Sequence, residues 1–447
     1  MKNRSVAVLG GGLSGMAVAC ALAREGFEEV TVLERGAELG GLAGTFERDG
    51  HFYPLAYHHI LHRDRTLLYF LQSIGALPRV QWRRIHMLFH LDGRNYDLSD
   101  PIGFLRYPMS LTDKARFVRL MLKSFRKSNW DDWHGRSAAE LVDRWAGPGV
   151  RRAMFDPLCR LKFDLPCEGT SGAWLGARLH AREGSDSLGY IPGCNWTQVL
   201  CDGITRLLES QGVRIRLRTT VKKLYAEGDR IAEVEVESGP AVRSDVVVST
   251  LPTEIYSLLA PHDQTTGLES IRYTAVISVI FATRQTVHPK FYWMNMMSRD
   301  THASGLFVLD NLNPTIGAPG ETVLNFMTHI PSRDREFFRR SDDEIVEGYR
   351  EDFRKVFGKE LDPSWTHISR LPLYSPVFDR GYRNLPVRSE SWRNVYFAGN
   401  YRTFPSVAST GTALGSGLEA ARAILEEDGR TSSLLREADA FVSRGPV

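Results

Sequence analysis

The sequence predicts an α/β protein built on a Rossmann-type nucleotide-binding domain, and three observations near the N-terminus support this class. Residues 5–9 (SVAVL) form a short, β-branched apolar run that is typical of a strand buried on both faces of a sheet. A glycine-rich turn at residues 10–15 follows directly and fits the pattern GxGxxG. The Ala-rich stretch 16–25 has the composition of a helix, and residues 30–33 form a second apolar run. Strand, turn, helix and strand therefore follow in the order of a dinucleotide-binding βαβ unit.

The residues of this unit have separate physical roles. Gly10 permits the tight turn, Gly12 lets the backbone approach a pyrophosphate, and Gly15 lets the helix pack closely against the strand. The N-terminus of the helix favours the negative charge of the phosphates. Glu34 ends the second strand about 20 residues after Gly12, where a carboxylate binds a ribose hydroxyl and disfavours a 2′-phosphate. We therefore expect a dinucleotide other than NADP.

Composition narrows the possible functions. The length of 447 residues suits two or three domains, and the hydrophobic content of 43% is that of a folded globular protein. The chain has 56 Lys and Arg residues and 53 Asp and Glu residues. The resulting net charge of +3 gives no overall attraction to nucleic acid. The five cysteines lack the spacing of a zinc site, and no apolar stretch approaches the roughly 20 residues of a membrane span. We expect a cytoplasmic protein with a small-molecule substrate, no metal and no nucleic-acid partner.

Further segments extend the pattern beyond a plain NAD-binding domain. Arg35 is followed by a second glycine-rich segment, residues 39–44 (LGGLAG). Residues 245–252 (DVVVSTLP), residues 395–400 (VYFAGN) and a strand expected at 213–224 complete the set. Together they resemble motifs of the FAD-dependent amine oxidase and protoporphyrinogen oxidase superfamily. The resemblance implies a GR2-like flavoprotein with FAD in the Rossmann-type domain. A cysteinyl flavin of the kind found in some members is excluded, because the second half of the chain has no cysteine, and we expect FAD to be non-covalent.

The resemblance also implies which residues hold FAD. The small-residue helix start after Gly411 is expected to direct its positive end at the N1 and C2 edge of the flavin and to stabilise the reduced anion. Asn400 stands where the superfamily often carries an acid, so its contact to the cofactor is expected to be neutral. The residues expected to bind FAD are Gly10, Gly12, Leu13, Ser14, Gly15, Glu34, Arg35, Gly40, Gly41, Leu42, Val221, Thr250, Gly399, Asn400, Gly411, Thr412 and Ala413.

The positions of these motifs predict a discontinuous organisation. The expected segments are 1–60, 195–265 and 388–447 for the FAD-binding domain, 61–100 and 266–387 for an inserted α+β substrate domain, and 101–194 for a helical insertion. Residues 342–357 are expected to form an amphipathic helix on the substrate domain. The residues after Gly429 are expected to be a loosely docked end.

One helix of the insertion, at residues 111–127, is strongly amphipathic. A helical wheel places six apolar side chains on one side, namely Phe117, Val118, Leu120, Met121, Leu122 and Phe125. The other side carries Arg116, Arg119, Lys123, Arg126 and Lys127. Such a helix can lie on an anionic lipid surface, which would give peripheral contact with the inner membrane face. The same pattern fits an ordinary solvated face over a domain core, and the sequence leaves both interpretations open.

Candidate substrate-side residues follow the first FAD motif. Residues 59–62 (HILH) resemble the HIFH segment of UDP-galactopyranose mutases, which lies beside the flavin, and this makes His59 a catalytic candidate. A structural histidine bonded to the backbone is the alternative. Arg178 and Arg182 lie in a stretch that resembles the same enzymes, and two arginines near a flavin can clamp an anionic substrate. A domain-interface ion pair is the alternative for both arginines.

The resemblance predicts an enzyme, an FAD-dependent oxidoreductase that dehydrogenates a hydrophobic ring or isoprenoid-like substrate by hydride transfer to flavin N5. Protoporphyrinogen oxidases and phytoene desaturases are of this type, and the aromatic residues of the expected substrate domain suit an apolar pocket. A nucleotide-sugar mutase that resembles UDP-galactopyranose mutase is the first alternative, favoured by His59 and the two arginines. An amine oxidase is the second alternative, although Ser409 stands where that family carries an aromatic residue.

Overall fold

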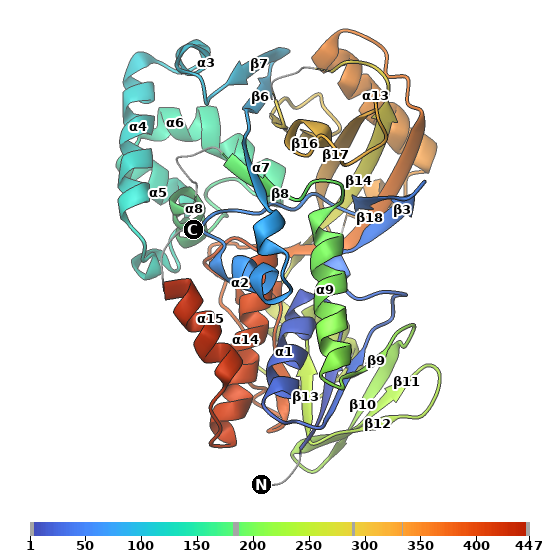
Figure 1. Ribbon diagram of the computed structural model, residues 1–447. Coiled ribbons are helices and arrows are strands. Elements are labelled where there is room, and N and C mark those ends of the chain that lie inside the picture. Colours follow the sequence, from blue (N-terminus) through green and yellow to red (C-terminus); the bar gives the residue numbers. More distant parts are fainter. Residues whose placement is uncertain (1–3, 182–186, 288–290, 333, 444–447) are drawn as a thin grey trace.

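The computed structural model describes residues 4–181, 187–287, 291–332 and 334–443, which form two lobes (Figure 1). A five-stranded parallel sheet is the centre of the lower lobe. Its strands in spatial order are β19 (Val395–Phe397), β13 (Val246–Ser249), β1 (Ser5–Leu9), β2 (Glu29–Leu33) and β9 (Arg214–Arg216). Helix α1 (Leu13–Arg24) connects β1 to β2 and contacts α9 (Trp196–Ser210) and α14 (Thr410–Glu427). The predicted Rossmann-type βαβ unit is therefore confirmed.

This sheet is buried on both faces, as its apolar strands predict. Val6 and Val8 of β1 point to the core that contains α1, whereas Ala7 and Leu9 point to a core shared with a small antiparallel sheet. The strands of that sheet are β10 (Val221–Glu227), β11 (Arg230–Val236) and β12 (Val242–Arg243). The single strand expected at 213–224 is instead two strands, because the chain turns at Arg218, whose φ is 50°.

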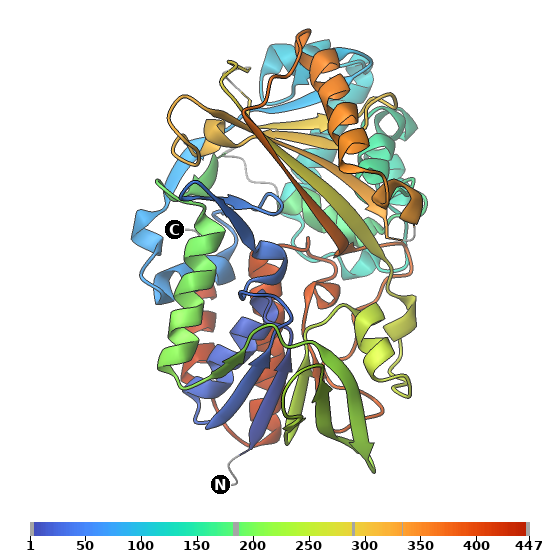
Figure 2. The ribbon, with the colours of Figure 1, turned by 90° about the vertical axis from the view of Figure 1, so that its right-hand side faces the viewer.

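A seven-stranded sheet is the centre of the upper lobe. Its strands in spatial order are β18 (Trp365–Pro376), β14 (Tyr273–Thr283), β17 (Thr322–Pro331), β16 (Gly305–Val308), β15 (Trp293–Met296), β6 (Met87–Leu91) and β7 (Arg94–Asp97). Helix α13 (Asp342–Phe357) packs on one face of this sheet (Figure 2). Its bounds match the prediction, because Ser341 and Glu344 form a capping box at its start and Gly358 ends it in the left-handed region.

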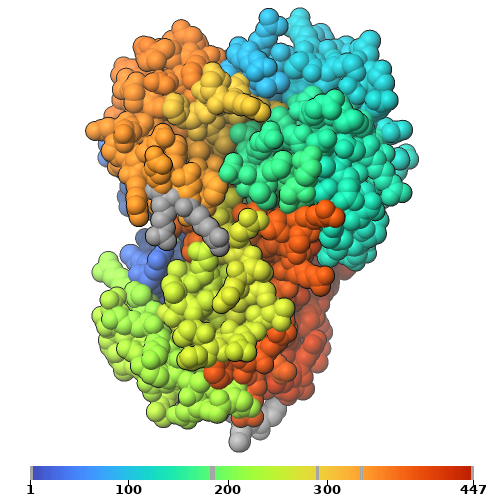
Figure 3. All heavy atoms as spheres, turned by 180° about the vertical axis from the view of Figure 1, so that it is seen from behind, coloured from blue at the N-terminus to red at the C-terminus, as the bar shows by residue number. Residues whose placement is uncertain are grey.

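Helices beside this sheet complete the upper lobe. They are α3 (Pro101–Arg106), α4 (Leu111–Arg126), α5 (Ala138–Trp145), α6 (Pro148–Val150), α7 (Asp156–Phe163) and α8 (Gly172–His180). Figure 3 shows this helical region, in teal, side by side with the region of the seven-stranded sheet, in orange, above the lower lobe. The fold is thus the predicted α/β class, with an α+β part and a helical insertion added to the Rossmann-type domain. The boundaries of the three parts stay a prediction.

The apolar residues of α4 do not share one environment, contrary to the helical wheel. Their directions span a wide arc, so the helix turns one edge of the arc inward and leaves the other edge in solvent. Leu120 is buried, and Phe117 and Met121 are partly buried. The side chains left exposed are Leu111, Val118, Leu122 and Phe125.

Shorter elements connect these parts of the chain. They are β3 (Thr45–Arg48), β4 (His51–Pro54), α2 (Arg65–Ser73), β5 (Gln81–Arg84), β8 (Ser187–Tyr190), α10 (Thr253–Leu259), α11 (Leu309–Leu312), α12 (Arg335–Phe338) and α15 (Ser433–Ser443). The expectation of a loosely docked end after Gly429 is wrong, because Leu434, Leu435 and Ala438 of α15 are buried and the helix contacts α2. Within the described ranges, no helix combines the length and the apolar character that crossing a membrane requires.

Candidate functional site

A cavity of about 1400 Å³ lies where the two lobes meet. The β1–α1 turn and the N-terminal end of α14 line it from the lower lobe. Strands β16, β17 and β18 and helices α4, α7 and α8 line it from the upper lobe. Sites for one small ligand typically have about 300–1,000 Å³. The cavity therefore has room for a cofactor and a substrate together.

Two glycine segments form one end of this cavity. The N–H of Gly40 donates to the carbonyl of Gly11 over 2.8 Å, so the second segment lies directly beside the β1–α1 turn. A Cβ atom built on Gly12 would meet only the Cα of Gly41, at 4.0 Å, so the space beside Gly12 is open. A Cβ on Gly15 would lie 2.1 Å from the carbonyl oxygen of Gly10, so Gly15 is required for packing. This cradle fits a pyrophosphate at the N-terminus of α1.

Glu34 is held in place beside this cradle. Its two carboxylate oxygens accept backbone N–H groups from Gly11 and Gly36, each over 2.7 Å. The carboxylate also lines the cavity, with Val221 at the same end. Ionised carboxylates can accept about four hydrogen bonds, so two remain for a ligand. This arrangement fits the ribose of an adenosine.

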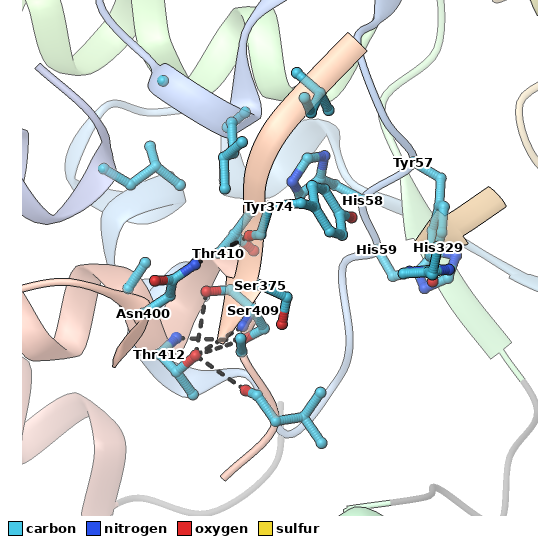
Figure 4. Close-up of a pocket in the computed structure, with 18 of the residues that line it drawn as sticks. Tyr57, His58, His59, His329, Tyr374, Ser375, Asn400, Ser409, Thr410 and Thr412 are labelled. Carbon is cyan, nitrogen blue, oxygen red and sulfur yellow. Dashed lines mark hydrogen bonds between the residues drawn. The ribbon is translucent and has the colours of Figure 1, made fainter. Parts of the chain in front are cut away.

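The N-terminus of α14 forms the next part of the wall (Figure 4). Ser409 caps this helix, because its side chain accepts the N–H of Thr412 over 3.2 Å and the N–H of Ser409 donates to the Thr412 hydroxyl over 2.8 Å. The N–H of Gly411 donates over 3.3 Å to the carboxylate of Asp64, which also lines the cavity. Asn400 donates its amide N–H to the carbonyl of Tyr374 over 3.2 Å. Apart from the carboxylate of Asp64, the groups that line the cavity here are small and neutral.

The cavity brings together nearly all of the residues expected to bind FAD. Two of them do not line it: Gly15 is packed between helix and strand, and Gly411 contacts Asp64. Those that line it are Gly10, Gly12, Leu13, Ser14, Glu34, Arg35, Gly40, Gly41, Leu42, Val221, Thr250, Gly399, Asn400, Thr412 and Ala413. Their side chains and backbone fit a dinucleotide that extends from Glu34 to the N-terminal end of α14.

His59 lies among aromatic rings on the other side of the cavity (Figure 4). Its ring centroid is 5.5 Å from that of Trp293, and its Nε2 atom is 3.1 Å from the hydroxyl of Tyr292. Burial, together with the nearby His58 and Arg178, lowers the pKa of His59 to about 3. His59 is therefore neutral near pH 7. The aromatic wall continues in Tyr57, which stacks on Phe307 at 3.8 Å between centroids.

The three histidines of this segment point to different partners. His58 bonds through Nδ1 to the carbonyl of Ala56 over 2.8 Å, and burial lowers its pKa to about 4. His62 stacks on Trp82 at 3.4 Å between centroids. Among the described residues, no group of three His, Cys, Asp or Glu side chains is arranged to hold a metal ion.

Arg178 lines the cavity from α8, and the sequence suggested Arg182 as the second cation beside it. Arg182 lies outside the described residues. Instead, Lys162 on α7 lines the same part of the cavity, and Arg178 lies near enough to help lower the pKa of Lys162. The Nζ atom of Lys162 is 3.3 Å from Nε2 of His329 on β17. Sequence analysis missed Lys162 and His329, because the local pattern around each is that of an ordinary helix or strand.

Comparisons with known proteins agree with this arrangement. The family model described as flavin containing amine oxidoreductase matches residues 13–425, so the chain belongs to this family. The 15-cis-phytoene desaturase of Solanum lycopersicum is 22% identical over 484 residues, with 98% of this chain and 81% of the desaturase covered. A candidate protoporphyrinogen oxidase from Exiguobacterium sp. 255-15 has a similar structure, with a TM-score of 0.77 at 19% identity over 96% of this chain and 100% of that one. Reduced UDP-galactopyranose mutase has a TM-score of 0.72 at 13% identity, over 100% of this chain and 98% of that one.

The family establishes the class of enzyme. The protein is an FAD-dependent oxidoreductase of the amine oxidase superfamily, and the predicted cofactor is confirmed. The two solved structures share its fold at low sequence identity, so they define the architecture and leave the substrate open.

Proposed function

We propose that the protein dehydrogenates a hydrophobic, isoprenoid-like substrate. The observation that carries this proposal is the aromatic and apolar wall around His59, in which the histidine is neutral and partly buried. When bound, FAD takes up a hydride at N5. The substrate loses this hydride from one carbon and a proton from the neighbouring carbon to water, and a double bond forms between the two carbons. Such a step depends on the position of the C–H bond, which a rigid apolar wall can fix.

The chain's own residues divide the work in this proposal. Gly12 and Gly41 would border the pyrophosphate, and Glu34 would accept hydrogen bonds from the ribose. Thr412 and the first turn of α14 would lie at the flavin. Tyr57 and Phe307 hold the substrate body and exclude water from it. The likeness to a tomato protein named as a phytoene desaturase supports the isoprenoid class, because it extends over 98% of this chain.

The charge of the site argues against the second alternative, an amine oxidase. Arg178 and Lys162 both line the substrate part of the cavity. Arg178, and Lys162 below its pKa of about 7, would repel the ammonium group of an amine. Ser409 caps α14 and supplies no aromatic face for such a group. An amine substrate is therefore disfavoured on two independent grounds.

The first alternative, a nucleotide-sugar mutase, remains a candidate function. Its support is the similar structure of UDP-galactopyranose mutase, together with the two cations, which would suit phosphates. The aromatic wall favours an apolar substrate body over a polar sugar. The two functions differ in one measurable property, the redox state of the flavin that the reaction requires.

Anaerobic mixing of the enzyme with candidate substrates distinguishes dehydrogenation from mutase chemistry. The purified enzyme with oxidised FAD is mixed with an isoprenoid in detergent micelles, either phytoene or an isoprenoid carboxylate, or with UDP-galactopyranose. The flavin absorbance near its oxidised maximum is followed. Bleaching by the isoprenoid alone supports dehydrogenation. Conversion of the sugar nucleotide only after prior reduction with dithionite would overturn it in favour of mutase chemistry.

We also propose that α3 and α4 contact an anionic lipid surface. Leu111 is 75% exposed and Leu122 is 56% exposed, and Ile102 and Leu105 of α3 are exposed as well. Basic residues of α4, such as Arg126, border these apolar side chains. Apolar residues insert at the lipid interface while basic residues attract anionic headgroups. Since Phe117 and Met121 of α4 line the cavity, the same helix adjoins the substrate site.

Vesicle sedimentation tests this contact. The unmodified protein is expected to sediment with phosphatidylglycerol vesicles at low salt and to be released as salt rises. A double variant, Leu122→Asp with Phe125→Asp, is expected to remain in the supernatant. Leu258→Asp is the matched control, because Leu258 is a similarly exposed leucine on α10 in the other lobe. Equal sedimentation of both variants, or none by the unmodified protein, would contradict the proposal.

A further inference from the structure

Of the cations on α7, α8 and β18 that line the cavity, Arg370 forms an ion pair with Asp342, whereas Lys162 and Arg178 have no acid beside them among the described residues. The acidic side chains that line the cavity are Glu34, Glu38 and Asp64, all on segments that form its cofactor end. In the part of the chain that the structure describes, Lys162 contacts His329 and Arg178 contacts Trp174, and neither forms an ion pair with a carboxylate. Cations withdrawn from water are costly when unpaired. Such a pair is therefore expected to serve a ligand.

Lys162 is held in a defined position by a chain of hydrogen bonds. The hydroxyl of Ser304 donates to the carbonyl of Met327 over 3.0 Å, so its oxygen is free to accept the Nδ1–H of His329, also over 3.0 Å. Nε2 of His329 is then the acceptor for Lys162, at 3.3 Å. This fits the low pKa of His329, which burial and the two cations keep neutral. An ammonium group has three donors, so two remain after the bond to His329.

Arg178 faces the same space from the neighbouring helix. Its guanidinium lies 5.7 Å from the ring centroid of Trp174 on α8, a contact that orients the side chain without using its N–H groups. Within the described ranges no hydrogen-bond acceptor is close enough to pair with it. The planar guanidinium thus presents unused donors to the cavity, where it can bind two oxygens at once.

We propose that Lys162 and Arg178 bind an oxyanion, a carboxylate or a phosphate, at one end of an otherwise apolar substrate. This deepens the dehydrogenase proposal and rests on it for the apolar body of the substrate. The aromatic wall of Tyr57 and Phe307 holds that body, while the two cations hold the anionic group. A pure hydrocarbon would leave both cations desolvated and unpaired, whereas an anionic amphiphile compensates them. His329 is a positioning residue in this arrangement, since it acts through Lys162.

Binding of simple amphiphiles to the holoenzyme tests the site without turnover. The probes are decanoate, decyl phosphate and decanol, which share one apolar chain and differ in the head group. Affinity is measured by calorimetric titration, and entry into the cavity by the change in the flavin absorption spectrum. Both anions are expected to bind at least about tenfold more tightly than decanol, because hydrogen bonds to charged groups are strong. The ratio between decanoate and decyl phosphate identifies the preferred oxyanion.

Substitutions assign the effect to the two cations. Lys162→Met and Arg178→Met are each expected to weaken decanoate binding about tenfold to a hundredfold and to leave decanol binding unchanged. Lys222→Met is the matched control, because Lys222 is an exposed lysine on β10. His329→Gln is expected to give a smaller loss than Lys162→Met. Should Arg178→Met fail to fold, Arg178→Lys is used, which keeps the charge and loses the planar contact.

The outcomes separate this proposal from the proposed function. Anions that bind no better than decanol, or variants that bind them as well as the unmodified enzyme, would overturn the oxyanion site and leave dehydrogenation unaffected. Selective anion binding that both variants abolish would support the site, even if no isoprenoid bleaches the flavin. In that case the anion site would stand and the dehydrogenase proposal would fail.

Discussion

Removing the charge of Lys162 should stabilise the fold, although it removes a predicted ligand contact. Burial, with a smaller contribution from Arg178, lowers the pKa of Lys162 from 10.5 to about 7. The folded protein therefore opposes protonation of this amine. A methionine of similar length fills the same space without a charge, and its flexible side chain adapts to the cavity wall. We expect Lys162→Met to raise the stability of the ligand-free protein.

The magnitude follows from the size of this change. A fall from 10.5 to about 7 corresponds, at about 1.4 kcal/mol for each pH unit, to about 5 kcal/mol against the charged form. Water in the cavity screens part of this cost, because Lys162 lines the cavity and is only partly buried. The variant also loses the bond to His329 and the contact with the ring of Tyr374, together about 1 to 2 kcal/mol. The net gain expected is about 2 kcal/mol at pH 6.

The gain should depend on pH in a defined direction. Between pH 7 and pH 10.5 the unfolded chain binds a proton at Lys162 that the folded protein does not, so the stability of the unmodified protein rises with pH in this range. Below pH 7 both states are protonated and the full cost is present. The charged or titratable groups that face the amine are Arg178, which stays charged, and His329 and Tyr374, whose shifted pKa values keep them neutral. The difference between variant and unmodified protein should therefore shrink from pH 6 to pH 9.

Denaturant unfolding of the FAD-saturated proteins at pH 6 and pH 9 measures this difference. Lys222→Met is again the control, because an exposed lysine should change the unfolding midpoint little at either pH. The reasoning would be refuted if Lys162→Met were less stable than the unmodified protein at pH 6. It would also be refuted if the difference were the same at both pH values, since an amine whose pKa is lowered by folding must show this dependence.

Three further predictions concern the cofactor and His59. Gly12→Val is expected to fold, since the space beside Gly12 is open, but to purify with little flavin; a fully yellow variant would place the pyrophosphate elsewhere. Glu34→Ala is expected to weaken FAD binding by about 1.5 to 3 kcal/mol in equilibrium dialysis of the apoprotein, and unchanged affinity would remove Glu34 from the site. His59→Phe is expected to keep most of the turnover and its pH profile, because His59 is neutral at pH values well above its pKa of about 3. A loss of about a hundredfold or more would instead assign His59 a role in proton transfer.

The cofactor end of the cavity could be predicted from the sequence because its determinants are local. A strand, a glycine turn and a helix follow each other within about 20 residues, and Gly12 and Glu34 occupy fixed places in that order. Gly411 shows the limit of this reasoning. The sequence places it at the start of α14, but it does not show that Asp64, 347 residues away, packs against Gly411 and accepts its N–H.

The substrate end depends on contacts that no local pattern contains. Lys162 and His329 are 167 residues apart, on a helix and on a strand of different parts of the upper lobe. Their contact exists only because α7 packs against β17. The same limit applies to α4, since the neighbours of a helix decide which edge of a wide apolar arc is buried. A helical wheel shows the arc and cannot show the neighbours.

Charge separates the possible substrates more sharply than the fold does. Similar structures occur in enzymes named for very different chemistry, so a TM-score near 0.7 cannot choose among them. Two cations without a carboxylate among the described residues oppose an ammonium substrate, and they oppose a neutral hydrocarbon because they would stay unpaired when water leaves the cavity. The aromatic wall of Tyr57 and Phe307, in turn, suits an apolar body better than a sugar. An apolar molecule with an anionic end satisfies both conditions.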